Sequence, residues 1–151
     1  MAAVTVRAAR NRDAPTVLAL HGFTGSGEDF LPLREALGAD RAHWILPDFM
    51  GHGASSSPDV LDPYCLPAAL RLIDAARRKA PDPRRVVLVG YSMGGRLALH
   101  YLRWAAPLPC LLIGASPGLE DPGERKTRRQ QDRRWITPLL EIGRASCRER
   151  V

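Results

Sequence analysis

Apolar residues in this chain fall into short continuous runs, separated by segments with helical spacing. The runs at residues 16–20, 44–46 and 86–89 have no polar alternation, which predicts β-strands that are buried on both faces. Residues 4–8 predict an edge strand, and residues 111–113 predict a further strand after the last helix. These runs therefore predict a sheet whose central strands are covered on both sides.

Between the runs, apolar side chains recur with the period of a helix. Phe30, Leu33 and Leu37 lie at positions i, i+3 and i+7, which predicts a short amphipathic helix over residues 29–37, ended by Gly38. The same spacing predicts helices over residues 64–79 and 93–104. Alternating strands and helices predict an α/β fold, a mostly parallel sheet with helices on both faces.

The strand at residues 86–89 runs into Gly90-Tyr91-Ser92-Met93-Gly94, a Gly-x-Ser-x-Gly pattern followed by a helix. A serine on such a sharp strand-to-helix turn is exposed, and Gly90 and Gly94 give the clearance that the turn needs. The helix N-terminus would stabilise negative charge beside Ser92. The pattern thus predicts Ser92 as an activated serine, and the alternative is a glycine-rich turn with an idle serine.

A second glycine-rich loop, from His21 to Gly27, follows the strand at residues 16–20. Since the carboxyl ends of parallel strands share one edge, this loop and the Ser92 turn face the same crevice. An oxyanion site needs two N–H donors, and the backbone amides of Phe23 and Met93 form the predicted pair. A phosphate-binding role is disfavoured, because neither a P-loop nor a Gly-x-Gly-x-x-Gly spacing is present. His21 is predicted to brace the loop.

Composition narrows the possible partners. The chain has 151 residues, 45% hydrophobic and 25% charged, as in a globular domain. The net charge is +6, and the 20 arginines beside only 2 lysines suggest a coding bias. No aromatic-interleaved basic strand and no recognition-helix pattern accompanies the charge, so no nucleic-acid partner is predicted. Three cysteines lack metal-type spacing, so no metal site is expected. With no membrane-length apolar stretch and no signal-peptide core, the expected location is cytoplasmic, without a membrane partner.

Three segments together resemble the α/β-hydrolase family: His21-Gly22-Phe23, the loop at residues 47–53, and Gly90 to Gly95. Two further features are more specific. Arg96 follows Ser92 by four residues, and Ser116-Pro117-Gly118-Leu119 precedes a Glu-Arg-x-x-Arg-Arg-x-x-Asp block that ends at Asp132. These features resemble the 2-succinyl-6-hydroxy-2,4-cyclohexadiene-1-carboxylate synthases of menaquinone biosynthesis, over residues 16–140.

That resemblance implies a lyase that eliminates pyruvate from 2-succinyl-5-enolpyruvyl-6-hydroxy-3-cyclohexene-1-carboxylate, with Ser92 as the triad base and without a cofactor. It also implies a small-molecule carboxylate substrate, bound by Arg96 and Arg128 together with Tyr91 and Trp135. Arginine suits this role because its planar fork pairs bidentately with carboxylate. A generic serine esterase or C–C bond hydrolase stays open as an alternative, as does a non-catalytic fragment.

In the family, the triad acid and histidine follow the serine, and we expect both to be absent from this chain. His43, His52 and His100 are poor substitutes by position. Residues 141–151 match the translation of a short-read sequencing adaptor and are excluded from the fold. We therefore expect the front part of an α/β-hydrolase core over residues 1–119, the start of a helical cap over 120–140 and a non-native tail over 141–151. Little catalysis is expected from the chain itself, and its oligomeric state is left open.

Overall fold

A computed structural model describes residues 1–105, 107–116, 121–131 and 134. The chain divides into two compact units, Met1–Pro117 and Gly118–Val151, each of which is treated by itself. The predictions for Trp135 and for residues 141–151 lie outside the described residues.

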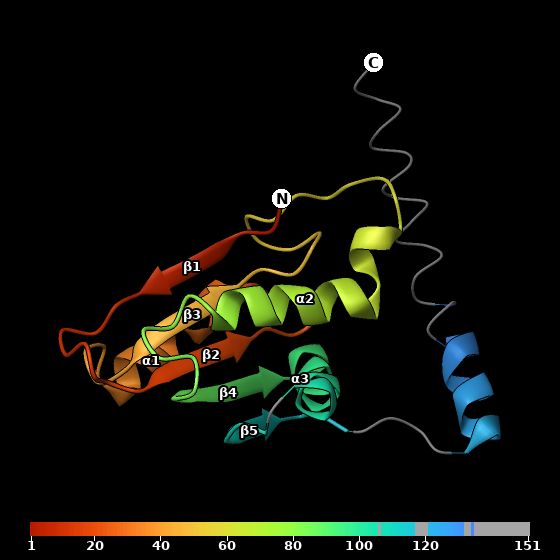
Figure 1. The fold of residues 1–151 in the computed structure, drawn as a ribbon. Coiled ribbons are helices and arrows are strands. Elements are labelled where there is room, and N and C mark those ends of the chain that lie inside the picture. Colours follow the sequence, from red (N-terminus) through yellow and green to blue (C-terminus); the bar gives the residue numbers. More distant parts are fainter. Residues whose placement is uncertain (106, 117–120, 132–133, 135–151) are drawn as a thin grey trace. The chain divides into compact units, whose positions relative to one another are not determined.

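The first unit is built on a five-stranded sheet with the order β1-β3-β2-β4-β5 (Figure 1). Neighbouring strands are parallel, except that β1 runs antiparallel to β3. This arrangement confirms the predicted mostly parallel α/β sheet. The strands are β1 (Val4–Arg7), β2 (Thr16–Leu20), β3 (His43–Pro47), β4 (Val86–Tyr91) and β5 (Cys110–Ile113).

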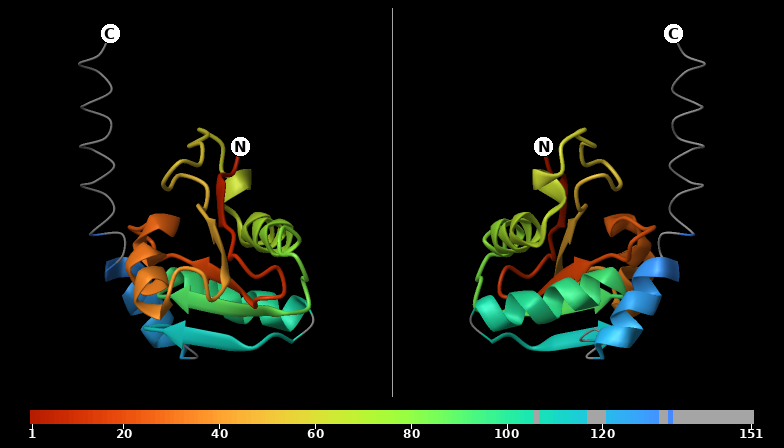
Figure 2. Two further views of the ribbon diagram at one scale, coloured as in Figure 1. Left: turned by 90° about the vertical axis from the view of Figure 1, so that its left-hand side faces the viewer. Right: turned by 90° about the vertical axis from the view of Figure 1, so that its right-hand side faces the viewer.

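Helices cover both faces of this sheet, and α1 (Leu31–Leu37) and α2 (Leu66–Arg77) lie on opposite sides in Figure 2. The two faces follow from the strand period of two residues. Leu18 and Leu20 of β2 pack in one cluster with residues of α2 and of α3 (Met93–Trp104). Ala19, between them, packs with Phe30 on the α1 side. The central strands are therefore buried on both faces, as their continuous apolar runs predict.

Two predicted helices begin differently from the prediction. The helix predicted over residues 29–37 starts earlier, as the 3-10 turn η1 (Gly27–Phe30), because Ser26 caps it through the N–H of Glu28. The helix predicted over 64–79 is divided into a 3-10 turn, η2 (Asp62–Tyr64), and α2. Pro67 has no N–H to donate, so it is accommodated in the first turn of a helix that begins at Leu66.

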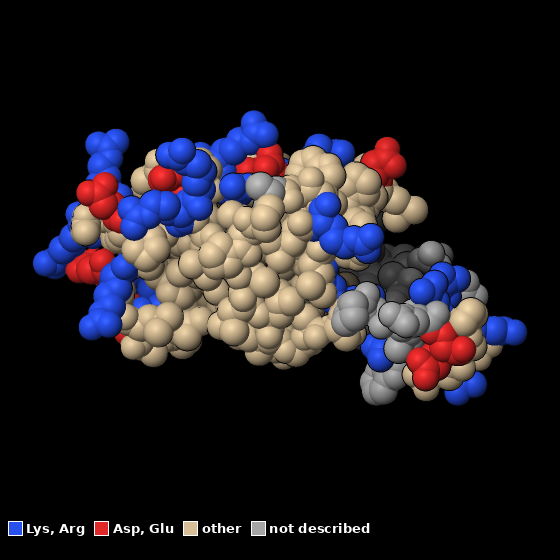
Figure 3. Space-filling view, turned by 60° about the horizontal axis from the view of Figure 1, so that its bottom comes forward, with Lys and Arg blue, Asp and Glu red and all other residues tan. Residues whose placement is uncertain are grey.

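β5 forms one edge of the sheet, and apolar side chains are exposed there. Leu111 is 52% exposed and Ile113 is 41% exposed. Figure 3 shows a broad surface without charged side chains, on the side of the molecule where β5 lies in Figure 1. An exposed apolar strand at a sheet edge favours association with other chains.

The described part of the second unit is a helix over residues 122–131, which carries Arg128. Asp121 precedes this helix and accepts a hydrogen bond from the N–H of Glu124 at 2.8 Å. That contact is typical of an N-cap. In the part of the chain that the structure describes, no helix combines the length and the apolarity that crossing a membrane requires.

Candidate active site

Ser92 lies between the end of β4 and the start of α3, with φ 50° and ψ −109°. It is the only non-glycine residue with a positive φ among the described residues. Such a conformation costs about 1–3 kcal/mol and persists only where the surroundings enforce it. The predicted strained turn at Ser92 is therefore confirmed.

Glycines surround this turn where the backbone segments approach one another closely. A Cβ on Gly94 would lie 2.0 Å from the carbonyl oxygen of Leu20, and a Cβ on Gly90 would lie 2.6 Å from the Cα of Gly95. Both neighbours are backbone atoms, which cannot move aside without displacing a strand or a helix. The structure thus confirms that Gly90 and Gly94 provide the clearance for the turn.

The loop after β2, from His21 to Gly27, also reaches the Ser92 turn, and we call it the Phe23 loop. A Cβ on Gly22 would lie 2.9 Å from the ring of Tyr91 and 3.7 Å from the Cβ of Ser92. Met93 opens α3, so its N–H has no acceptor within the helix. The structure therefore brings the Phe23 loop and the start of α3 to Ser92, and their role as an oxyanion pair stays a prediction.

His21 fixes the Phe23 loop through hydrogen bonds of its two ring nitrogens. Its Nδ1 lies 2.7 Å from the carbonyl oxygen of Gly22, and its Nε2 accepts the N–H of Phe49 at 3.0 Å. The ring is fully buried, and this burial lowers the pKa of His21 below its ordinary value. A neutral ring with its proton on Nδ1 satisfies both contacts and confirms His21 as a loop brace. Fixing the Gly22 carbonyl also fixes the N–H of Phe23, because both belong to one planar peptide.

Asp48 ties the loop after β2 to the loop after β3. Its carboxylate accepts the N–H of Gly27 at 2.7 Å and the N–H of Ala54 at 2.9 Å, while its carbonyl accepts the hydroxyl of Ser55 at 2.6 Å. Bonds to a carboxylate are stronger than bonds between neutral groups. The sequence analysis assigned no role to Asp48, although an aspartate just before a glycine-rich turn is typical of such a brace.

His52 packs beside Phe23, with the two ring centroids 5.8 Å apart. Its Nδ1 lies 3.0 Å from the carbonyl oxygen of Met50, and its Nε2 lies 2.5 Å from the carbonyl oxygen of Phe23. Both ring nitrogens are therefore directed at the backbone. This arrangement agrees with the prediction that His52 is not the base partner of Ser92.

The other histidines also lie where they cannot assist Ser92. His43 is the first residue of β3, not a residue before it, and its Nδ1 accepts the N–H of Ala9 at 3.1 Å. His100 is exposed on α3, two turns beyond Ser92.

The residues predicted to bind substrate are only partly brought together. Tyr91 ends β4 and is 52% exposed beside Gly22. Arg96 is exposed one turn into α3, and its backbone N–H donates to the carbonyl oxygen of Ser92 at 3.1 Å. Arg128 belongs to the second unit, so its place relative to Ser92 stays a prediction.

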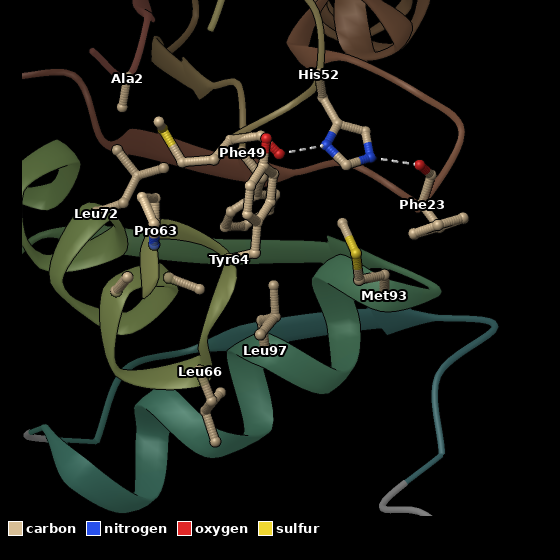
Figure 4. A pocket seen from close by; sticks show the side chains of 13 residues that line it. Ala2, Phe23, Phe49, His52, Pro63, Tyr64, Leu66, Leu72, Met93 and Leu97 are labelled. Carbon is tan, nitrogen blue, oxygen red and sulfur yellow. Dashed lines mark hydrogen bonds between the residues drawn. The ribbon is translucent and has the colours of Figure 1, made fainter. Parts of the chain in front are cut away.

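A cavity of about 480 Å³ borders the Phe23 loop and the start of α3 (Figure 4). The sequence analysis missed it, because its walls come from segments that are far apart in the chain. Its lining is largely apolar: Ala2, Phe23, Phe49, Met50, His52, Pro63, Tyr64, Leu66, Ala68, Ala69, Leu72, Met93 and Leu97.

Among the described residues, no group of three or more His, Cys, Asp or Glu side chains is placed to hold a metal ion. Cys65 and Cys110 are both exposed free thiols.

Comparison with known proteins gives one family. The family model described as the alpha/beta hydrolase fold matches residues 15–110. The chain is 35% identical, over 129 residues, to the 2-succinyl-6-hydroxy-2,4-cyclohexadiene-1-carboxylate synthase of Yersinia pestis, covering 80% of this chain and 43% of the relative. It is 34% identical, over 145 residues, to the chloroplastic protein PHYLLO of Arabidopsis thaliana, covering 88% of this chain and 8% of that protein.

Solved structures agree on the fold. MenH from S. aureus matches with a TM-score of 0.66 and 27% identity over 85% of this chain and 48% of the neighbour. A thioesterase domain from the curacin biosynthetic pathway matches with a TM-score of 0.68 and 25% identity over 87% of this chain and 48% of the neighbour. The chain thus spans less than half the length of these relatives. With the Ser92 turn, the strand order and the family match in agreement, this chain belongs to the α/β-hydrolase fold family.

Proposed function

We propose that the protein carrying this chain is a carbon–oxygen lyase of menaquinone biosynthesis, which eliminates pyruvate from 2-succinyl-5-enolpyruvyl-6-hydroxy-3-cyclohexene-1-carboxylate. The support comes from a curated synthase at 35% identity and from the MenH neighbour. Because the chain spans 43% of that synthase, the proposal applies to a protein that also has the residues completing the relatives' fold.

In the proposed reaction, the Ser92 hydroxyl passes its own proton to its base partner in the longer protein, and Ser92 Oγ then removes a proton from a carbon of the substrate. The electron pair of that C–H bond forms a C=C bond, and the C–O bond to the enolpyruvyl group breaks. The leaving group departs as the enolate of pyruvate and is protonated. Negative charge that develops near Ser92 is stabilised by the N–H groups of Phe23 and Met93, which are fixed before the reaction begins.

One observation carries the choice of a carboxylate substrate: Arg96 is exposed on the first turn of α3, the helix that follows Ser92. Within the described residues, Arg96 takes part in no ion pair. Its guanidinium is therefore placed to pair with a substrate carboxylate. An enzyme for neutral esters has no need of a cation there. In this proposal Arg128, Tyr91 and Trp135 supply further contacts with the substrate.

The test uses a longer gene product, in which this chain is followed by its genomic continuation. We expect this product to release pyruvate from the proposed substrate. The pyruvate is measured by its reduction in a coupled assay. Arg96→Ala is expected to lower kcat/KM by about 10–100-fold through a raised KM, since a charged hydrogen bond contributes about 1.5–3 kcal/mol. Turnover of p-nitrophenyl acetate without pyruvate release would overturn the proposal.

A serine esterase or C–C bond hydrolase is the second candidate, and the largely apolar cavity beside Met93 favours it. Ester turnover that depends on Ser92 but not on Arg96 would support this alternative. For the 151-residue chain alone we propose little or no catalysis, because a serine without its base partner loses most of its activation. Activity of this chain equal to that of the longer product would contradict that part of the proposal, and no activity in either would support the non-catalytic alternative.

A further inference from the structure

Residues Gly22 to Gly25 form a tight turn within the Phe23 loop. The N–H of Gly25 closes this turn by donating to the carbonyl oxygen of Gly22 at 3.1 Å. The two glycines have no side chain that could anchor the turn, and the Phe23 side chain between them is 66% exposed. Since burial of side chains contributes little, the direction of the Phe23 N–H depends on the hydrogen bonds made by the backbone of the turn.

Two histidines from different segments hold successive carbonyl groups of this turn. His21 Nδ1 lies 2.7 Å from the carbonyl oxygen of Gly22, and His52 Nε2 lies 2.5 Å from the carbonyl oxygen of Phe23 (Figure 4). Each carbonyl belongs to a planar peptide, and the two peptides meet at the Cα of Phe23. One anchor alone would let the turn rotate about it. Two anchors fix both peptides, and with them the direction of the Phe23 N–H.

His52 is itself held through its other ring nitrogen. Its Nδ1 lies 3.0 Å from the carbonyl oxygen of Met50, and its ring centroid lies 5.0 Å from that of His21. The loop after β3, which carries His52, is in turn tied to the N–H of Gly27 by the Asp48 carboxylate at 2.7 Å. A neutral imidazole has one N–H, and the shorter contact assigns that proton to Nε2, the nitrogen that faces the turn.

We propose that His52 is a positioning residue for the reaction at Ser92. By donating Nε2–H to the Phe23 carbonyl, it keeps the Phe23 N–H directed at the negative charge that develops beside Ser92. His52 acts through the backbone of Phe23 and not on the reacting atoms. The inference rests on the proposed function only in taking the Phe23 N–H as an oxyanion donor.

Amide NMR of the 151-residue chain tests this anchoring without any substrate. The chain has three phenylalanines, Phe23, Phe30 and Phe49, so labelling with ¹⁵N-phenylalanine gives three amide signals. In His52→Ala we expect the order parameter of the Phe23 N–H to fall from about 0.85 to below about 0.6, while those of Phe30 and Phe49 stay unchanged. An unchanged value for Phe23 would overturn the proposal. An equal fall at all three phenylalanines would overturn it as well, because His52 would then support the whole fold and not this turn.

Variants of the longer gene product separate the two contacts of His52. The side-chain nitrogen of glutamine lies as many bonds from Cβ as His52 Nε2, whereas that of asparagine reaches only the position of Nδ1, near the Met50 carbonyl. Removing one oxyanion donor lowers kcat by about 10²–10³-fold, and a loosened donor loses part of that. We therefore expect His52→Ala and His52→Asn to lower kcat for pyruvate release by about 10–100-fold with little change in KM. His52→Gln should stay within about threefold of the parent. His100→Ala, at an exposed position on α3, is the control and should keep its rate.

The outcomes separate the role of His52 from the proposed function. Equal kcat values for His52→Asn and His52→Gln, or a raised KM with unchanged kcat in His52→Ala, would overturn the positioning role alone. A longer product that releases no pyruvate with His52 intact would refute the lyase assignment, and the order parameter of the Phe23 N–H would still decide whether His52 anchors the turn.

Discussion

Replacing His21 by phenylalanine tests how the Phe23 loop is held against the Ser92 turn. Phenylalanine keeps a planar ring in the fully buried position but removes both ring nitrogens. The N–H of Phe49 then has no acceptor, while the carbonyl of Gly22 keeps its bond from the N–H of Gly25 at 3.1 Å. One buried donor is therefore left unsatisfied, and one further hydrogen bond is lost.

The magnitude follows from these two losses. An unsatisfied buried donor costs about 1–3 kcal/mol, and a lost hydrogen bond to a carbonyl costs about 0.5–1.5 kcal/mol. The free energy of unfolding of His21→Phe is thus expected to fall by about 2–4 kcal/mol. His100→Phe, on the exposed face of α3, removes a histidine without such contacts and is expected to stay within about 0.5 kcal/mol of the parent chain.

Urea denaturation followed by tryptophan fluorescence measures both variants, because Trp44 is buried in the sheet. A fall for His21→Phe of less than about 0.5 kcal/mol, or an equal fall for His100→Phe, would refute the view that His21 braces this loop.

The other predictions concern pH, the turn and the sheet edge. Burial lowers the pKa of His21 in the folded chain below its ordinary 6.5, so the unfolded chain binds the proton first as pH falls. We therefore expect the free energy of unfolding to decrease below about pH 6.5. In His21→Phe, the free energy of unfolding should depend less on pH in this range. Parallel pH profiles in urea would speak against this. Gly94→Ala is expected to destabilise the chain by at least about 3 kcal/mol, because its Cβ would lie 2.0 Å from the Leu20 carbonyl oxygen. Gly123→Ala should be nearly neutral, because its Cβ would meet only the Asp121 side chain. Equal melting temperatures for the two variants would contradict the packing argument. Leu111→Lys on the β5 edge is expected to raise solubility more than Leu37→Lys, which changes a leucine of similar exposure on a helix. Solubility is measured as the protein left in the supernatant after centrifugation. An equal gain for both variants would mean that the β5 edge is not the source of association.

Local sequence predicted the elements that are fixed by local patterning. The strand at Thr16–Leu20 and the helix at Met93–Trp104 have the predicted bounds, because each carries one uninterrupted periodicity. The helix starts at Gly27 and Leu66 were missed, since a capping serine and a proline each moved the start by two residues.

Contacts between distant segments were harder to predict. Gly-x-Ser-x-Gly predicted the Ser92 turn because its glycines and its backbone strain are local. The links made by Asp48 span up to 21 residues, and the cavity is assembled from Ala2 to Leu97. Such features depend on tertiary packing, which no single window of sequence contains.

The most direct test of the central claim is pyruvate release by the longer gene product carrying Ser92→Ala. General-base catalysis contributes about 10²–10⁴-fold, so we predict a fall in kcat of that size with little change in KM. Ser57→Ala, at an exposed serine in the loop after β3, is the matched control and should keep its rate. A kcat for Ser92→Ala within about threefold of the parent would contradict the claim that Ser92 removes the proton.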